Sequence, residues 1–265
     1  GTVGLVGDID QLAVDAAGGT ENLRFIDTAA GMTIGTVEDV VGLLATTVYL
    51  QSNDGGIAQA AGATIQAASG GIALRATGPI RLDQENDFNL AAAFAGTDYN
   101  DATTWQPIYL RTAGPLTVST FGPGQPGGQP FPALGPLPFV NVPAGVIGIR
   151  GSNVSLVAGG DLVQSDLAVI LADDGSGGGS FLATVLDGSD VVMASMANEL
   201  GVNPIIAALK TDGTLGSIAN LELKTAGAVA LGAGGILAVD LITAGSGYTS
   251  APTLSVNGVA TTDLV

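Results

Sequence analysis

Residues Gly71 to Leu82 read GIALRATGPIRL, a pattern from which the strand arrangement of the chain can be predicted. Aliphatic residues alternate with other residues on both sides of Gly78. Alternation with a period of two is typical of a strand with one buried face, and glycine tolerates a sharp bend between two strands. The stretch therefore predicts two short strands that meet at a glycine corner.

Close copies of this unit return later in the chain. Ile108 to Val118 (IYLRTAGPLTV) keeps every offset, Leu221 to Leu231 (LELKTAGAVAL) has Lys224 in place of arginine, and Ile147 to Leu156 (IGIRGSNVSL) is one residue shorter. Such a unit cannot form a core alone, so its copies must stack on one another. We expect an all-β fold, a parallel β-solenoid, and more narrowly a right-handed β-helix. The predicted core residues are Ile72, Leu74, Ile80, Leu82, Ile108, Leu110, Leu116, Val118, Leu221, Leu223, Val229 and Leu231, and the predicted corner glycines are Gly78, Gly114 and Gly227.

The copies predict two solenoid halves, residues 1–121 and 146–241. Residues 122–145 between them are rich in proline and glycine. Proline cannot donate to a central strand ladder, so this stretch is either a loop that leaves the solenoid or a hinge between the halves. Residues 242–265 are expected to form a C-terminal edge or hairpin.

Residues 189–210 carry signals of a helical insert in the second half. Ser189 and Asp190 precede VVMASMANEL and could cap a helix that ends at Gly201. Pro204 could then occupy the first turn of a second helix, IIAALK. The sequence predicts two short helices here.

The composition excludes several classes of function. The chain has 265 residues, with 41 glycines and 7 basic against 24 acidic residues, a formal net charge of −17. This charge disfavours nucleic acid and anionic membranes as partners, and no apolar run reaches the length of a membrane span. Histidine and cysteine are both absent, which excludes a histidine-containing catalytic triad. The chain begins in mid-pattern without methionine or a signal peptide, so we expect a processed product or a segment of a larger protein.

The repeat copies resemble a known family. LRATGPIRL and VSLVAGGDLVQS are similar to the coils of giant repetitive bacterial surface proteins of the filamentous-haemagglutinin type, and ITAGSGYTSAPTLSV resembles a glycine-rich segment of bacterial surface and fibre proteins. The resemblance implies export to the cell surface, a right-handed β-helix, and adhesive or scaffolding duty.

Two groups of acids are candidate sites. Asp83, Glu85 and Asp87 form the densest cluster, which is either a solvated turn, a glycosidase acid pair or a calcium site. The second group flanks a glycine-rich turn and is a candidate calcium site, although it has neither EF-hand nor calcium-roll spacing. Its members are Asp173, Asp174, Asp187 and Asp190.

Basic and aromatic residues give two further expectations. Arg75, Arg111, Arg150 and Lys224 occupy the same place in the repeat copies, and we expect them to pair with acids on the surface, with an anion-binding or carbohydrate-binding stripe as the alternative. The aromatic residues Tyr99, Trp105 and Tyr109 are close in sequence, and they either pack on the flank of a coil or form a sugar-stacking platform.

The leading hypothesis is a non-enzymatic, extracellular structural protein, with no catalytic residue and no cofactor except a candidate calcium ion. It would be a β-solenoid subunit or segment of a bacterial surface fibre, sheath or adhesin that self-associates through strand edges or coil ends. One alternative is a polysaccharide lyase, hydrolase or tailspike-like depolymerase on a β-helix. Another is a glycan-binding adhesin domain, with a cell-surface polysaccharide as the partner.

Overall fold

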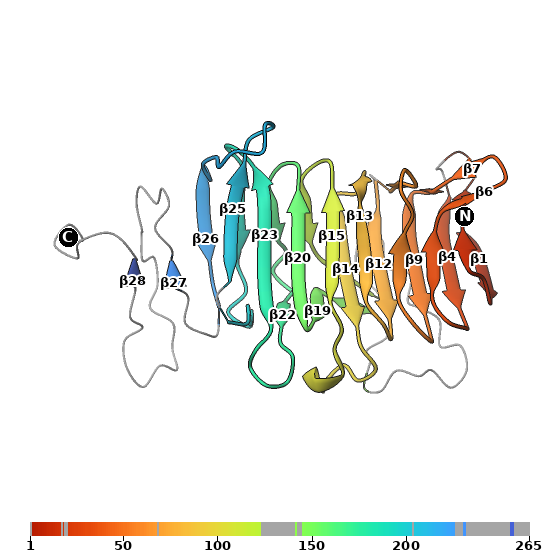
Figure 1. The fold of residues 1–265 in the computed structure, drawn as a ribbon, viewed down its shortest axis with the longest axis horizontal. Helices are drawn as coiled ribbons and strands as arrows, with labels where there is room; N and C mark the ends of the chain where they lie inside the picture. Colours follow the sequence, from red (N-terminus) through yellow and green to blue (C-terminus); the bar gives the residue numbers. More distant parts are fainter. Residues whose placement is uncertain are drawn as a thin grey trace.

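The protein is built almost entirely from β-strands. The computed structural model describes residues 2–16, 18, 21–67, 69–122, 141, 145–202, 204–225, 230–231 and 255–256. Figure 1 shows the strands side by side in a long row that runs from β1 at one end to β26, with the short strands β27 and β28 beyond β26. Two large sheets in this row are parallel throughout. The prediction of an all-β fold with parallel strands is confirmed.

Sheet A is the larger of the two and has eleven strands. Its main path is β1 (Thr2–Gly7), β4 (Asn22–Asp27), β9 (Thr47–Ser52), β12 (Gly71–Ala76), β14 (Leu90–Ala95), β16 (Leu116–Val118), β21 (Leu162–Gln164), β24 (Asp190–Met193) and β26 (Asn220–Leu223). Two strands lie off this path, β19 (Ile149–Gly151) and β22 (Ile170–Ala172).

Sheet B has eight strands and sheet C has three. Sheet B runs in the order β2 (Gln11–Leu12), β5 (Met32–Ile34), β10 (Ile57–Gln59), β13 (Ile80–Asn86), β15 (Ile108–Thr112), β20 (Asn153–Ala158), β23 (Ser180–Leu186) and β25 (Ile205–Leu209). Sheet C contains β3 (Val14–Asp15), β8 (Leu43–Leu44) and β11 (Ile65–Gln66).

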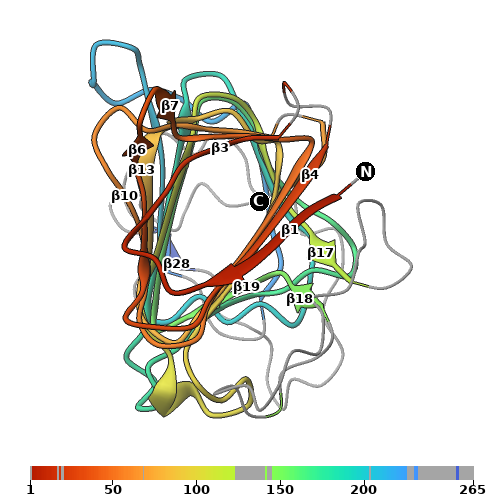
Figure 2. The same ribbon diagram turned by 90° about the vertical axis from the view of Figure 1, so that its right-hand side faces the viewer.

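The chain visits the sheets in a regular order. Leaving out the β6–β7 hairpin described below, it passes through sheets A, B and C three times in succession from β1 to β11, and from β12 it alternates mainly between A and B. The view along the stack shows these passages one behind another around a common interior (Figure 2). At the bends, glycines allow the backbones of successive passages to come close together. At Gly148, φ is +68° and an added Cβ would lie 1.9 Å from Val169 O of the next passage.

Short elements complete the structure. Three pairs of strands lie outside the large sheets: β6 (Thr36–Val37) with β7 (Val40–Val41), β17 (Thr120–Phe121) with β18 (Val146–Ile147), and β27 (Ala230–Leu231) with β28 (Ser255–Val256). Helical structure among the described residues is confined to η1, a 3-10 turn at Ala102–Thr104. In the same ranges, no helix has the length and apolar character that crossing a membrane requires.

Inward side chains form ladders through the stack. One ladder in sheet A consists of Leu5, Phe25, Leu50, Leu74, Ala93, Ile149 and Ile170, each in register with the next. All of these side chains except Leu5 are buried in one hydrophobic cluster. Burial of each large aliphatic side chain contributes about 1.5 to 3 kcal/mol to the free energy of unfolding. The buried ladders are therefore the main source of the stability of the fold.

Most of the residues predicted for the core belong to this hydrophobic cluster or pack against it. Eight of them are fully buried in it, and Leu221 and Leu223 pack against its edge. The eight are Ile72, Leu74, Ile80, Leu82, Ile108, Leu110, Leu116 and Val118. Val229 and Gly227 lie outside the described residues, and only the backbone of Leu231 is described.

The strands on the two sides of the proline-rich stretch belong to the same sheet. Most of residues 122–145 lies outside the described residues. On one side of this stretch β16 pairs with Leu90 and Ala91 of β14, and on the other side β19 pairs with Ala93 and Phe94 of the same strand. Both flanks therefore continue one sheet.

Two buried asparagines repeat one hydrogen-bond pattern. Each accepts hydrogen bonds from an isoleucine backbone N–H and a glutamine amide, and donates to the backbone oxygen of a basic residue in a later passage. The partners are Ile65, Gln59 and Arg111 around Asn86, and Ile170, Gln164 and Lys224 around Asn198, at 2.6 to 3.1 Å. Each side chain thus joins successive passages and satisfies buried backbone groups.

The two predicted helices are wrong. Asp190–Met193 is strand β24 and Ile205–Leu209 is strand β25. Val191 and Met193 point inward and are buried, in register with Leu221 and Leu223. The open edges of β21 and β23 offer a full strand ladder to these segments, and this pairing outweighs local helix signals.

Candidate functional site

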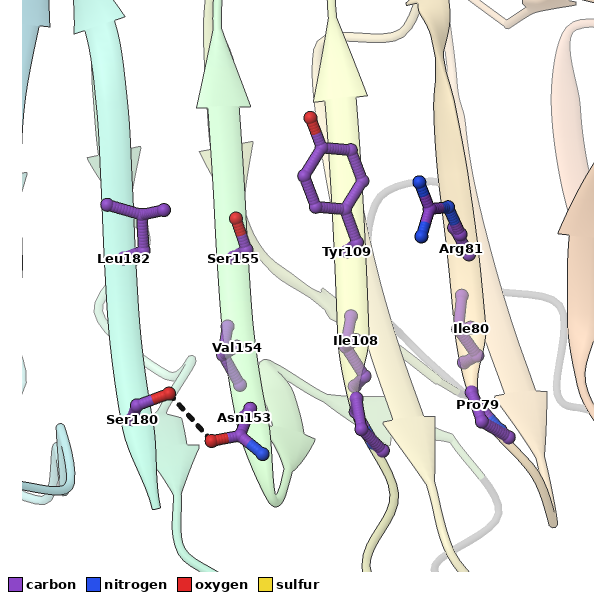
Figure 3. A pocket seen from close by; sticks show the side chains of 11 residues that line it. Pro79, Ile80, Arg81, Ile108, Tyr109, Asn153, Val154, Ser155, Ser180 and Leu182 are labelled. Atoms are coloured by element: carbon purple, nitrogen blue, oxygen red, sulfur yellow. Dashed lines mark hydrogen bonds between the residues drawn. The ribbon is translucent and has the colours of Figure 1, made fainter. Parts of the chain in front are cut away.

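A hollow of about 350 Å³ lies on the outer face of sheet B. It crosses strands β13, β15, β20 and β23 and is lined mainly by apolar side chains (Figure 3). Adjacent strands in a sheet are about 4.8 Å apart, so the hollow spans about 14 Å. Its outward row, in register across the four strands, consists of Arg81, Tyr109, Ser155 and Leu182.

The hollow is lined by a few polar side chains, which come from all of its strands; on β15 the only polar group among them is the Tyr109 hydroxyl. Ser180 Oγ donates to Asn153 Oδ1 at 2.6 Å along one rim. Ser155 Oγ is buried and has no hydrogen-bond partner among the described residues. The guanidinium carbon of Arg81 lies 5.9 Å from the centre of the Tyr109 ring. The hollow therefore offers an aromatic face, an aliphatic wall and hydroxyl and amide groups.

The positive charge beside the hollow is compensated. Arg81 Nε donates to Asp83 Oδ2 at 2.9 Å. Hydrogen bonds from Gln84 and Arg81 lower the pKa of the Asp83 carboxyl, so it stays ionised at neutral pH. The site thus carries no net charge, and its electrostatics favour an uncharged ligand over an anion or a cation.

The three predicted aromatic residues do not form one platform. Tyr99 and Trp105 are buried in a second hydrophobic cluster on the outer face of sheet A, with Phe94 and Phe121. The indole Nε1 of Trp105 donates to Asp98 O at 2.9 Å. Tyr109 instead stands on sheet B and lines the hollow. Sequence proximity did not predict this separation, because the chain changes sheet between Trp105 and Tyr109.

The basic residues of the repeat copies divide into two groups. Arg111 pairs with Glu85 at 2.7 Å and Lys224 pairs with Glu222 at 2.9 Å, as expected for surface ion pairs. Arg75 and Arg150 instead flank Phe94 in register on sheet A.

The contacts of these two arginines include a backbone carbonyl and an aromatic ring. Arg75 is 2% exposed and donates to Gly145 O at 3.2 Å, and burial lowers its pKa to about 10. The Arg150 guanidinium lies 4.0 Å from the centre of the Tyr99 ring. Burial raises the pKa of Tyr99, which keeps this phenol neutral. The group is arranged for packing, with the cations stacked among rings and carbonyls.

Two of the four predicted calcium ligands, Asp173 and Asp174, accept hydrogen bonds within a local turn. Asp173 Oδ1 accepts from Gly175 N–H, and Asp174 Oδ1 accepts from the hydroxyl of Ser176, which is the main cause of its lowered pKa, and from two backbone N–H groups. The other two lie apart from this turn: Asp187 Oδ1 accepts from the Ser217 backbone N–H, and the Asp190 backbone N–H donates to Asp161 Oδ1. In the part of the chain that the structure describes, no group of three or more acidic side chains is placed to hold a metal ion.

The acidic cluster of β13 is arranged for ion pairing. Asp83 is neutralised by Arg81, and Glu85 by Arg111. A glycosidase needs a general acid whose pKa is raised, whereas that of Asp83 is lowered. Asp87 forms a bridge with Gln66 through its backbone. This geometry does not favour acid catalysis at the cluster.

The two ends of the stack form a second candidate surface, which sequence reasoning expected only in general terms. β1 and β2 are the last strands of sheets A and B at one end, and β26 and β25 are the last at the other. Leu5 continues a core ladder but is 45% exposed at the β1 end. Strand edges and core side chains at such ends can accept further strands.

Comparison of the chain with protein-family models, with curated proteins and with solved structures finds no match in any of the three.

Proposed function

We propose that this chain is a structural segment of a bacterial surface fibre, sheath or adhesin, built as a parallel β-solenoid of the right-handed β-helix type. It self-associates through strand edges or coil ends, outside the cell, and has no enzymatic activity. The likeness of its repeat copies to surface proteins of the filamentous-haemagglutinin type supports this assignment.

The observation that carries the proposal is the repeated passage through sheets A, B and C in one order, with parallel register between successive passages. A chain that winds in this way buries its aliphatic ladders only where another passage covers them. The outermost passages are therefore the surfaces to which further strands add. A stiff rod with adhesive ends suits a mechanical role, and a net charge of −17 opposes lateral clumping of rods.

Electron microscopy of the purified protein tests self-association. We expect rods longer than one molecule, and we expect Leu5→Lys to shorten or abolish them, because a charge at the end of a core ladder must be desolvated in the contact. Ala58→Lys is the matched control, since Ala58 is exposed on the side of the stack in β10. Monodisperse monomers at every salt and calcium concentration would contradict the proposal.

The hollow on sheet B favours a second function, binding of a neutral glycan. Tyr109 offers a ring for stacking, and the exposed Asn153 and Ser180 offer groups that hydrogen-bond hydroxyls. Calorimetric titration with linear neutral oligosaccharides tests it. Tyr109→Ala should weaken binding about tenfold or more, while Tyr109→Phe, which keeps the ring, should retain it. Preference for uronic-acid oligosaccharides, or equal binding by the alanine variant, would count against this function.

A further inference from the structure

The outer face of sheet B divides into a charged part and an uncharged part. The charged residues of β13 and β15 form the two ion pairs described above. The next three strands of the sheet, β20, β23 and β25, contain no charged residue at all. The hollow crosses the boundary between the two parts, so a ligand that lies in it meets both.

One outward row runs through both parts in register. It consists of Arg81, Tyr109, Ser155, Leu182 and Ile205, one residue from each of the five strands. Figure 3 shows the first four of these side chains in line along the outer face. Three strand intervals separate Tyr109 from Ile205, a distance of about 14 Å. The row therefore changes from a cation and an aromatic ring at one end to aliphatic side chains at the other.

The aliphatic end of this row is open to solvent. Leu182 is 38% exposed and Ile205 is 58% exposed. Further along the same two strands and on the same face, Leu186 lies in register with Leu209, and Leu186 is also exposed. Adjacent exposed aliphatic side chains of this kind mark contact sites. We name these four residues, Leu182, Leu186, Ile205 and Leu209, the aliphatic strip.

The charges of the molecule limit what can cover the aliphatic strip. A second copy would bring another chain with a net charge of −17 against this face, and the two would repel each other. A charged ligand would find no opposite charge on the strip, and in the hollow Arg81 is already paired with Asp83. Neither penalty applies to a neutral ligand. Asn153 and Ser180 suit hydroxyl groups, whereas the strip offers only apolar contact, so the ligand that fits both has a hydroxylated part and a hydrocarbon part.

We propose that the hollow and the aliphatic strip together bind a neutral sugar that carries an alkyl or acyl chain. The sugar stacks on Tyr109 and bonds through its hydroxyls with Asn153 and Ser180, and the chain lies across Leu182 and Ile205. The chain adds affinity because it covers aliphatic surface that is otherwise in contact with water. This inference rests on the proposed glycan binding at the hollow and names the class of glycan.

Calorimetric titration with matched pairs of neutral glycosides tests the inference. The probes are the methyl and the hexyl glycosides of maltose, cellobiose and lactose, each below the concentration at which it forms micelles. Full burial of one methylene group corresponds to about fourfold in affinity, and we expect about twofold for each on this open face. Hexyl adds five methylene groups, so the hexyl glycoside of the disaccharide that binds should bind at least about tenfold more tightly than its methyl glycoside.

Two variants separate the two parts of the site. Ile205→Asn should remove most of the hexyl gain and leave the affinity for the methyl glycoside within about twofold, because Ile205 contacts only the chain. Tyr109→Ala should weaken both glycosides by the same factor. Leu167→Asn is the matched control, since Leu167 is 65% exposed in the turn between β21 and β22 of sheet A and should change neither affinity. A full hexyl gain in Ile205→Asn would overturn the inference.

Two further outcomes would give the aliphatic strip to another partner. A dimer in sedimentation that Ile205→Asn dissociates would show that a second copy covers the strip. Flotation of the protein with vesicles of pure phosphatidylcholine, which carry no sugar, would show that a lipid surface does. Either result would overturn the inference.

The titration also distinguishes this inference from the proposed glycan binding. If the methyl and hexyl glycosides bind equally, the inference is wrong and glycan binding at the hollow stands. If none of the glycosides and none of the oligosaccharides bind, both fail together.

Discussion

Gly78 and Gly114 occupy matching places in two copies of the repeat, but their surroundings differ. A Cβ added at Gly78 would lie 2.7 Å from backbone atoms of Gly55 and Gly56 in the preceding passage. At Gly114 nothing lies within 4 Å of an added Cβ. The glycine of the first copy thus allows two backbones to approach, and that of the second does not serve this purpose.

We therefore expect Gly78→Ala to destabilise the protein by about 1 to 3 kcal/mol through overpacking, and Gly114→Ala to change stability by less than about 0.5 kcal/mol. Urea unfolding monitored by circular dichroism measures both midpoints. Equal losses in the two variants would mean that the corner glycines act through backbone conformation and not through packing.

The buried asparagines lead to a second expectation for single residues. Asn198→Ala would leave the Ile170 N–H and the Gln164 amide without their partner in the interior. Because buried donors that lose a partner keep their desolvation penalty, the loss should be about 2 to 4 kcal/mol. Asn100→Ala is the control, since Asn100 is exposed, and its effect should stay within about 0.5 kcal/mol. A small loss for Asn198→Ala would show that water replaces the amide.

Inward and outward side chains alternate along each strand, and substitutions at two adjacent positions of one strand can test this. In β23, Val185 points into the core and Thr184 lies on the outer face. Val185→Asp buries an unpaired charge and should cost about 4 kcal/mol or more, while Thr184→Asp should cost about 1 kcal/mol or less. Far-UV circular dichroism and urea midpoints compare the pair. Similar losses would indicate that β23 is covered on both faces.

The strands could be predicted from the sequence to the extent that their side chains alternate. Ile72, Ile80, Ile108 and Leu116 alternate with smaller or polar residues and share one interior. The order of the copies was harder to predict. Ile80 of the first copy pairs with Ile108 of the second, although their positions in the repeat differ, because the copies turn at different corners.

The helical insert shows what local signals miss. Serine, aspartate and glycine cap helices, but they also make the bends between strands. Gly201 has φ +65°, and an added Cβ would lie 1.9 Å from Gly179 O of a neighbouring passage. The position therefore requires glycine for a corner and not for a helix end. The hollow was missed for a related reason, since its walls come from four strands that only the register brings together.

For the molecule as a whole, the stacked architecture predicts that local stability against opening is highest in the central strands and falls toward both ends of the row. Each passage contacts mainly its neighbours, so central passages are covered on both sides and terminal ones on one side. All six residues of β9 and all six of β12 are buried, whereas β1 is mostly exposed and β26 contains no fully buried residue. The ends should open locally without unfolding the centre.

Hydrogen exchange followed by mass spectrometry measures this gradient. Amides of β9 and β12 should exchange at least about tenfold more slowly than those of β1, which corresponds to about 1.4 kcal/mol in opening free energy. Assembly adds a second expectation, because a copy that covers the β1 end should slow exchange in β1 but leave β12 unchanged. Uniform protection in the monomer would mean that the stack unfolds as one cooperative unit, and then its ends would be no easier to remodel than its centre.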